Sequence, residues 1–240
     1  MKKIYFISDV HLGAHPENTE HEKVGKLLTF FKEIEKKTDY LYIVGDLFNF
    51  WFEYKHAIPK INLKVLAKLV DLVESGVEVR YFLGNHDQWH GSYFADETGV
   101  RIYPAPAEVV HNDLRLYIAH GDGLAANDSR NQILHKIFHN KLNRKLFRLL
   151  HPDWGIPLAQ TIAGKSAKRG LGGHENAYRS FAAQKIKQGY DAVILGHTHL
   201  PLFEKIESGY FVNLGDWFSN FTYLVLDGTE FRLLSWNEKS

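Results

Sequence analysis

The chain contains no cysteine in its 240 residues. A disulfide, a thiolate metal site and a cysteine nucleophile are therefore all excluded. Long apolar runs are also missing, since none approaches the ~18 residues that a membrane-spanning helix needs. Neither an internal repeat nor a linker interrupts the sequence. We expect one soluble, cytoplasmic domain covering residues 1–240, in which only nitrogen and oxygen atoms are available to hold a metal ion.

Charge is unevenly distributed, although the formal net charge is only +1. Residues 129–174 contain nine of the 29 Lys and Arg residues but only one of the 28 acids, Asp153. The rest of the chain is acidic. A basic segment of this kind indicates an anionic partner, such as a phosphate, a lipid headgroup or a nucleic acid.

Short apolar strands alternate with helical patterns in the first third of the chain. We predict strands at 4–7, 40–44 and 77–83, and helices at 20–37 and 62–75. This alternation is typical of βαβ units. Later we predict strands at 108–111, 114–119 and 192–195, a helix at 175–188, and strands around Phe211, Tyr223 and Phe231. The fold class is α/β: a sandwich of two mixed β-sheets flanked by helices, with a helical segment inserted at about 127–173.

Five polar clusters follow predicted strands. They are Asp9-Val10-His11, Gly45-Asp46, Gly84-Asn85-His86-Asp87, His120-Gly121-Asp122 and Gly196-His197-Thr198-His199. Strand ends are where α/β folds place their sites, and any one cluster alone would be an ordinary turn. Imidazole with carboxylate and amide oxygen suits Mn, Fe, Co or Zn better than Ca or Mg. Together the clusters predict a site in which two ions activate water and hold phosphoryl oxygens.

The order of these clusters resembles the calcineurin-like metallophosphoesterase superfamily. The resemblance implies that Asp9, His11 and His199 hold one divalent metal. It implies that Asn85, His120 and His197 hold a second, and that Asp46 bridges the two. It also implies that His86 is catalytic, oriented by the Asp87 carboxylate, and stabilises the transition state or protonates the leaving oxygen. Asn49 stands where the superfamily often has an acid.

Finer features resemble the UDP-2,3-diacylglucosamine hydrolases of lipid A synthesis. They are residues 8–13, Gly45-Asp46-Leu47-Phe48 with Trp51, 119–122, 196–201 and Leu214-Gly215-Asp216-Trp217. The family cleaves the pyrophosphate of a nucleotide-linked lipid and releases UMP, usually with Mn²⁺. The resemblance therefore implies two Mn²⁺ ions and a peripheral location on the cytoplasmic face of the inner membrane, with neither a nucleic acid nor an obligate protein partner. One branch of the family has Arg at the position of His86, and another has His.

The inserted segment has a basic amphipathic pattern. Its apolar residues are Ile133, Leu134, Ile137, Phe138, Leu142, Leu146, Phe147 and Leu150, with Lys136, Lys141, Arg144, Lys145 and Arg148 between them. Such a segment can lie on an anionic membrane or cover acyl chains, and it can equally be a helix packed on the domain. In the resembling family it forms a lid.

The resemblance also implies a set of substrate-binding residues: Asn85, His86, Asp122, Lys165, Ser166, Lys168, Arg169 and His197. For the basic residues among them, a solvated charged face is an equally good explanation.

Several residues near the motifs have simpler explanations. His15, His56, His90 and His111 lie outside the five clusters, and we interpret them as surface or core residues. The aromatic residues after Asp46 either wall a pocket or pack between helix and sheet: Phe48, Phe50, Trp51, Phe52 and Tyr54.

Three other functions compete with a lipid pyrophosphatase. The first is the same chemistry on a nucleotide, a cyclic nucleotide or a phosphoprotein, although a small substrate needs no apolar lid. The second is a noncatalytic scaffold, which intact ligand positions argue against. The third is a nuclease, whose binding would weaken steeply with salt.

Overall fold

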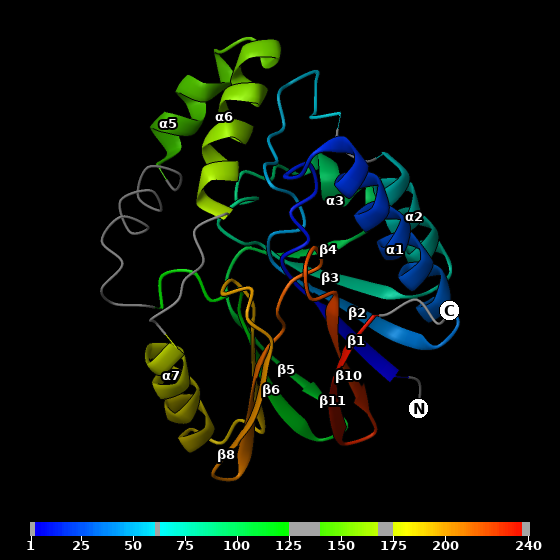
Figure 1. Cartoon of the computed structure of the whole chain (residues 1–240), viewed down its shortest axis with the longest axis vertical. Helices are drawn as coiled ribbons and strands as arrows, with labels where there is room; N and C mark the ends of the chain where they lie inside the picture. Colours follow the sequence, from blue (N-terminus) through cyan, green and yellow to red (C-terminus); the bar gives the residue numbers. More distant parts are fainter. Residues whose placement is uncertain (1–2, 61–62, 125–139, 168–174, 237–240) are drawn as a thin grey trace.

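The computed structural model describes residues 3–60, 63–124, 140–167 and 175–236. Two mixed β-sheets stack face to face, with helices on both outer faces of the sandwich (Figure 1). The predicted fold class is thus confirmed.

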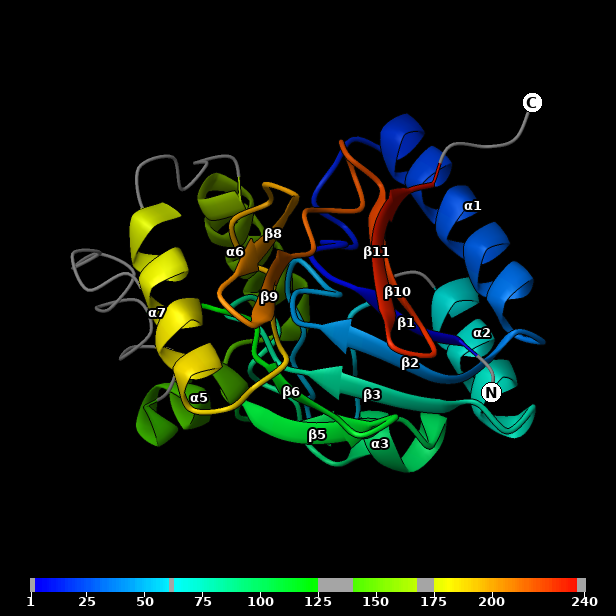
Figure 2. The same ribbon diagram turned by 90° about the horizontal axis from the view of Figure 1, so that it is seen from below.

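The first sheet has six strands in the order β11-β10-β1-β2-β3-β4. Strands β1 to β4 run parallel, and β10 and β11 are antiparallel additions at one edge. The strands are β1 Lys3–Ile7, β2 Thr38–Val44, β3 Glu78–Phe82, β4 Arg101–Tyr103, β10 Thr222–Asp227 and β11 Glu230–Ser235. Helices α1 (Glu17–Ile34) and α2 (Leu63–Glu74) cover the outer face of this sheet (Figure 2).

The second sheet has five strands in the order β5-β6-β7-β9-β8. Strands β6, β7 and β9 are parallel, while β5 and β8 are antiparallel edges. The strands are β5 Ala107–His111, β6 Leu114–Ile118, β7 Ala192–Leu195, β8 Leu202–Ile206 and β9 Gly209–Asn213. Helix α7 (Glu175–Lys187) packs on the outer face.

The core explains why the central strands are continuously apolar. In β1, Ile4 and Phe6 pack between the two sheets, whereas Tyr5 and Ile7 pack under α1 and α2. Successive side chains of a strand point to opposite faces, and both faces of this sheet are covered. The four buried positions of the strand, residues 4–7, are therefore all apolar.

Most predicted elements are present within two or three residues of their expected ends. The first helix begins at Glu17 rather than Glu20, after Pro16, which lacks the amide hydrogen that a helix interior requires. Three short elements were not predicted: β4, β8 and α3 (Tyr93–Thr98).

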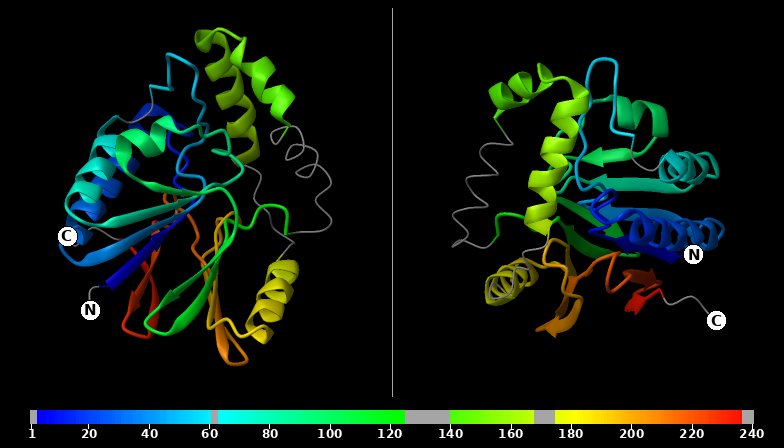
Figure 3. Two further views of the ribbon diagram at one scale, coloured as in Figure 1. Left: turned by 180° about the vertical axis from the view of Figure 1, so that it is seen from behind. Right: turned by 45° about the horizontal axis from the view of Figure 1, so that its top comes forward.

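Helices α5 (Lys141–Arg148) and α6 (Pro152–Ala167) lie at the end of the molecule towards which the strands of both sheets converge (Figure 3). They form the described part of the predicted insertion at 127–173. Its remaining residues lie outside the described ranges. No described helix is long and apolar enough to cross a membrane.

Candidate metal centre

Parallel strands from both sheets end at the same edge of the sandwich, and the predicted polar clusters follow those ends. Backbone hydrogen bonds join the loops there. The amide of Asp9 donates to the carbonyl of Gly45 (3.2 Å), and the amide of Gly196 donates to the carbonyl of His120 (2.9 Å). Two amides donate to carboxylates across the loops: His197 to Asp9 Oδ2 and His86 to Asp46 Oδ1, each at 2.9 Å. Together these bonds bring the clusters after β1, β2, β3, β6 and β7 into one region.

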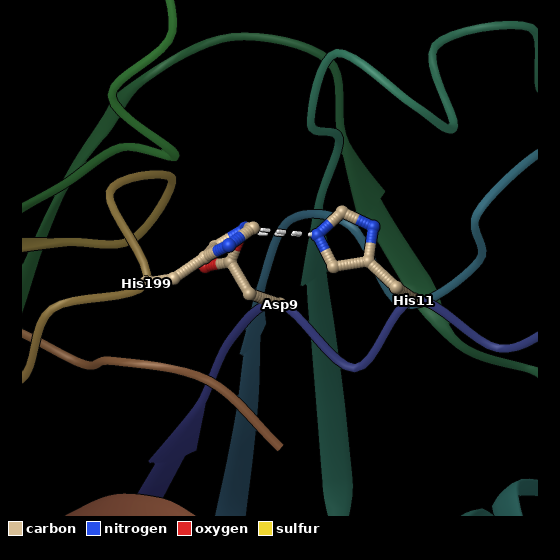
Figure 4. Close-up of side chains that lie close together, drawn as sticks. All are labelled: Asp9, His11 and His199. Atoms are coloured by element: carbon tan, nitrogen blue, oxygen red, sulfur yellow. Dashed lines mark hydrogen bonds and ion pairs between the residues drawn. The ribbon is translucent and has the colours of Figure 1, made fainter. Parts of the chain in front are cut away.

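Asp9, His11 and His199 form the first group (Figure 4). The Nε2 atoms of His11 and His199 are 3.0 Å apart, and Asp9 Oδ1 lies 3.6 and 3.2 Å from them. Asp9 Oδ2 accepts hydrogen bonds from the Ser8 hydroxyl and the His197 amide. Asp9 Oδ1 is buried and has no hydrogen-bond donor among the residues that the structure describes. A buried oxygen without a donor is costly, and a cation beside the two imidazoles would satisfy it.

Asp46, His120 and His197 form a second group. Asp46 Oδ2 lies 3.3 Å from His120 Nε2 and 3.7 Å from His11 Nε2, so it stands between the two groups. His120 Nδ1 is 2.9 Å from the carbonyl of Val44 and donates to it, which leaves Nε2 free to bind a metal. Asn85 Oδ1 lies 3.3 Å from the same Nε2.

The electrostatics of the cluster suit a cation. Burial lowers the pKa of His11 to about 4 and that of His197 to about 3, so both imidazoles are neutral near neutral pH and offer a lone pair. Burial opposes ionisation of Asp46, but the nearby His120 and His86 hold its pKa below the ordinary value. Buried carboxylates together with imidazoles form a ligand set for Mn, Fe, Co or Zn.

Backbone strain is concentrated at these same residues. Asp9, His11, Asp46, His197 and His199 have φ angles of 54°, 47°, 52°, 72° and 59°. They are five of the nine described non-glycine residues with positive φ. Each such residue costs about 1–3 kcal/mol and persists only where the surroundings enforce it. The loops are therefore held in a costly conformation that points their side chains at one volume.

Two glycines permit this close approach. A Cβ on Gly45, whose φ is +86°, would lie 2.1 Å from His120 Nδ1. A Cβ on Gly196 would lie 2.0 Å from the Ser8 hydroxyl oxygen. Any larger residue would push the loops of the two sheets apart.

A family profile described as calcineurin-like phosphoesterase matches residues 2–201. The chain belongs to the calcineurin-like phosphoesterases. Among similar calcineurin-like phosphoesterases are proteins named UDP-2,3-diacylglucosamine hydrolase from Porphyromonas gingivalis and Neisseria meningitidis serogroup C (strain FAM18). They are 31% and 32% identical to this chain, and each alignment covers 95% of both sequences. The Haemophilus influenzae (strain Rd) protein of the same name is 30% identical, with 94% of both sequences covered.

Solved structures agree on the fold. An archaeal phosphodiesterase superposes with a TM-score of 0.51 at 18% identity, covering 97% of this chain and 98% of its own. A phosphoesterase from E. coli gives a TM-score of 0.51 at 18% identity, covering 99% and 95%. The family membership establishes a metal-dependent hydrolase, which the two candidate ligand groups fit.

The predicted pairing of His86 with Asp87 is wrong. His86 Nδ1 lies 3.0 Å from the backbone carbonyl of Asn49 and donates to it. The Asp87 carboxylate instead accepts hydrogen bonds from the Tyr81 hydroxyl and from the amides of Gly84 (2.8 Å) and Phe48 (3.3 Å). Burial and the Asp46 carboxylate raise the pKa of Asp87 to about 7. Asp87 thus joins the loops after β2 and β3 rather than orienting His86.

His86 itself lies at the site. Its ring centroid is 4.7 Å from that of His11, and it forms a third group of candidate ligands with His11 and Asp46. The prediction that His86 acts on substrate and is not a ligand therefore stays a prediction. Asn49 stands where the superfamily often has an acid. Its backbone carbonyl, rather than its side chain, contacts His86.

The predicted substrate residues are only partly placed. Asp122 Oδ2 accepts a hydrogen bond from Gln88 Nε2 (3.3 Å), which links the loops after β6 and β3. Lys165 and Ser166 belong to α6. Lys168 and Arg169 lie outside the described residues.

The four histidines that were interpreted as surface or core residues lie outside both metal groups. His56 is exposed, His90 stacks on Trp51, and His111 Nε2 is 2.5 Å from the Tyr42 hydroxyl. His15 is half-buried beside Phe218, whose ring also contacts His199.

The aromatic residues after Asp46 pack rather than line an open wall. Phe48, Phe50, Trp51 and Phe52 are at most 4% exposed. The packing interpretation is therefore the correct one for these four.

Asp216 positions the loop after β9, a role that the sequence motif Leu214-Gly215-Asp216-Trp217 did not predict. Its carboxylate accepts hydrogen bonds from the amides of residues 218–220 and from the Asn220 side chain. Asn220 Nδ2 donates to the carbonyl of His199 (3.2 Å), and the Trp217 amide donates to the carbonyl of Asp9 (3.1 Å). The loop after β9 thus supports the backbone of two candidate ligands. The Gly-Asp after a strand was the only sequence signal.

Proposed function

We propose that this chain hydrolyses the pyrophosphate bond of UDP-2,3-diacylglucosamine to UMP and 2,3-diacylglucosamine 1-phosphate, using two divalent metal ions, Mn²⁺ in the cell. The observation that carries the substrate is the set of relatives bearing that hydrolase name, aligned over 94–95% of both sequences. The observation that supports the chemistry is the convergence of both predicted ligand sets on one buried volume.

In this proposal Asp9, His11 and His199 hold one ion. Asn85, His120 and His197 hold the other, with the Asp46 carboxylate between them. When bound, such ions lower the pKa of water and neutralise phosphoryl charge. A noncatalytic scaffold is less well supported, because it would have no need of these strained and buried polar loops.

The reaction needs a proton for the leaving oxygen, which His86 can supply, while the proton lost by the attacking water passes to solvent. The oxygen of water bonds to the α phosphorus, and the bond from that phosphorus to the bridging oxygen breaks, so the sugar phosphate leaves with the electron pair. The Asn49 carbonyl fixes His86 by accepting from Nδ1, which turns Nε2 away from that carbonyl. From there the protonated imidazole can donate to the leaving oxygen or stabilise its charge.

Helices α5 and α6 supply the apolar surface that a lipid substrate needs. On α6, Trp154, Leu158 and Ile162 follow one another at helical spacing and are 74%, 54% and 47% exposed. On α5, Leu142 and Leu146 are also exposed. Lys145 and Arg148 are exposed basic residues on the same helix. Exposed apolar and basic side chains together support contact with acyl chains and with an anionic membrane surface at the cytoplasmic face of the inner membrane.

In this proposal the insertion at about 127–173 is a lid that belongs to a single domain of residues 1–240. Its described helices, α5 and α6, contact the rest of the domain, with Phe147 at the centre of the aromatic packing. Phe147 packs against the rings of Phe52 and Trp89, at centroid distances of 4.8 and 5.2 Å. Arg144 also donates to the carbonyl of His90 (2.8 Å). The lid is thereby tied to the loops that carry Asp46 and His86.

The test is release of UMP from UDP-2,3-diacylglucosamine with added Mn²⁺, compared with a generic aryl phosphodiester at equal enzyme. Rapid UMP release with poor turnover of the generic ester is expected. Leu158→Ser, on the exposed face of α6, should raise KM for the lipid substrate only. The matched control is Leu63→Ser on α2, because Leu63 is also an exposed leucine (79%). Faster turnover of the generic ester would be consistent with two-metal phosphoesterase chemistry but would refute the lipid substrate.

A further inference from the structure

Lys23 is a charged residue that the metal chemistry does not use, yet it is buried beside the metal loop. It lies on the second turn of α1 and is only 1% exposed. Its Nζ atom lies 3.0 Å from Glu20 Oε2 and donates a hydrogen bond to the backbone carbonyl of His11 (2.8 Å). Lysine is almost never this buried without a specific partner.

Glu20 completes the arrangement on the other side of the loop. Its Oε1 accepts a hydrogen bond from the amide of Gly13 (2.8 Å), and its Oε2 accepts from the amide of His15 (3.4 Å). One ion pair on α1 therefore holds three backbone groups between residues 11 and 15. The amide of His11 is held separately, by the carbonyl of Asp46 (2.9 Å).

The energetics indicate a positioning role. Replacing a buried ion pair with apolar residues of similar volume is often neutral or stabilising, so the pair is a poor device for stability alone. His11 has a strained φ of 47°, and its ring must meet His199 and Asp9. Strained residues need surroundings that enforce their conformation. The Lys23 ammonium supplies that constraint at the His11 carbonyl.

We propose that the buried Glu20–Lys23 pair is the positioning device that presents His11 to the metal held by Asp9, His11 and His199. The inference rests on the metal centre proposed above, but not on the identity of the substrate. It concerns metal affinity, so it can be measured without turnover.

The experiment is calorimetric titration of Mn²⁺ into metal-free protein. The double variant Glu20→Gln/Lys23→Met removes the ion pair without leaving an unpaired buried charge, and the amide oxygen of the introduced glutamine can still accept from the Gly13 amide. The matched control is Lys26→Met on the same helix, because Lys26 pairs with the exposed Glu22. The double variant should bind one of two Mn²⁺ ions at least ~10-fold more weakly, and the control should bind both normally.

A second control separates positioning from loss of stability. Ile186→Ala shortens a buried side chain of α7. Ile186 belongs to a different apolar cluster from the one beneath α1. It should lower the Tm while leaving Mn²⁺ affinity unchanged. Equal Mn²⁺ affinities in the double variant and in Lys26→Met would overturn the inference, as would an equal loss in Ile186→Ala. If the unaltered protein bound no metal, the proposed function itself would fail.

Discussion

Replacing His86 by Ala tests whether His86 is a general acid or a metal ligand. In the structure the His86 ring is fixed by the Asn49 carbonyl, whereas its backbone amide donates to Asp46 Oδ1 (2.9 Å). An alanine keeps that amide, so the carboxylate between the two groups stays in place. General acid catalysis contributes ~10²–10⁴-fold, which corresponds to about 2.7–5.4 kcal/mol of activation free energy. We expect kcat to fall by that factor with the Mn²⁺ content unchanged.

The assay is steady-state UMP release together with metal analysis of the same protein samples. His56→Ala is the matched control, since His56 is exposed and outside the site. The reasoning would be refuted if the His86 variant lost one Mn²⁺ per chain, because His86 would then be a ligand alongside His11 and Asp46. A kcat within a few-fold of the unaltered enzyme would equally remove its catalytic role.

Two further predictions concern the metals themselves. Asp46→Ala should abolish tight binding of both ions and lower turnover by at least ~10³-fold, since the shared carboxylate is lost; retained activity in metal-free buffer would contradict this. Burial alone would lower the pKa values of His120 and His199, but the Asp46 and Asp9 carboxylates raise them by more than burial lowers them. Both pKa values therefore lie above the ordinary 6.5, and both rings are protonated in the metal-free chain at pH 6.5. Mn²⁺ must displace those protons, so affinity should rise with pH through their pKa values, and calorimetry in buffers of different ionisation enthalpy should detect proton release.

The sheets, and the positions of the candidate ligands at strand ends, were predictable from sequence for one physical reason. A strand covered on both faces is continuously apolar, so its end is marked sharply when Asp9, Asp46 or His197 follows. The edge strand β8 lacked that mark, since two adjacent charged residues, Glu204 and Lys205, interrupt its apolar run. Short α3 has too few residues for a helical period to show.

The supporting contacts of the site were less predictable, because they join residues that are distant in sequence or face away from their neighbours. Asp87 is adjacent to His86, yet its carboxylate turns towards Tyr81. Lys23 and Glu20 read as an ordinary charged pair three residues apart on a helix surface. Their spacing does not predict that residues 11–15 cover them.

The division of the candidate ligands between the two sheets has a mechanical consequence. Asp9 and Asp46 follow strands of the six-stranded sheet, whereas His120 and His197 follow strands of the five-stranded sheet. An ion held among them would be a cross-link between the halves of the sandwich. A ligand at 100 times its Kd adds about 2.7 kcal/mol to folding stability, and here that contribution opposes separation of the layers. Metal depletion would loosen the joint between the sheets as well as stop the reaction.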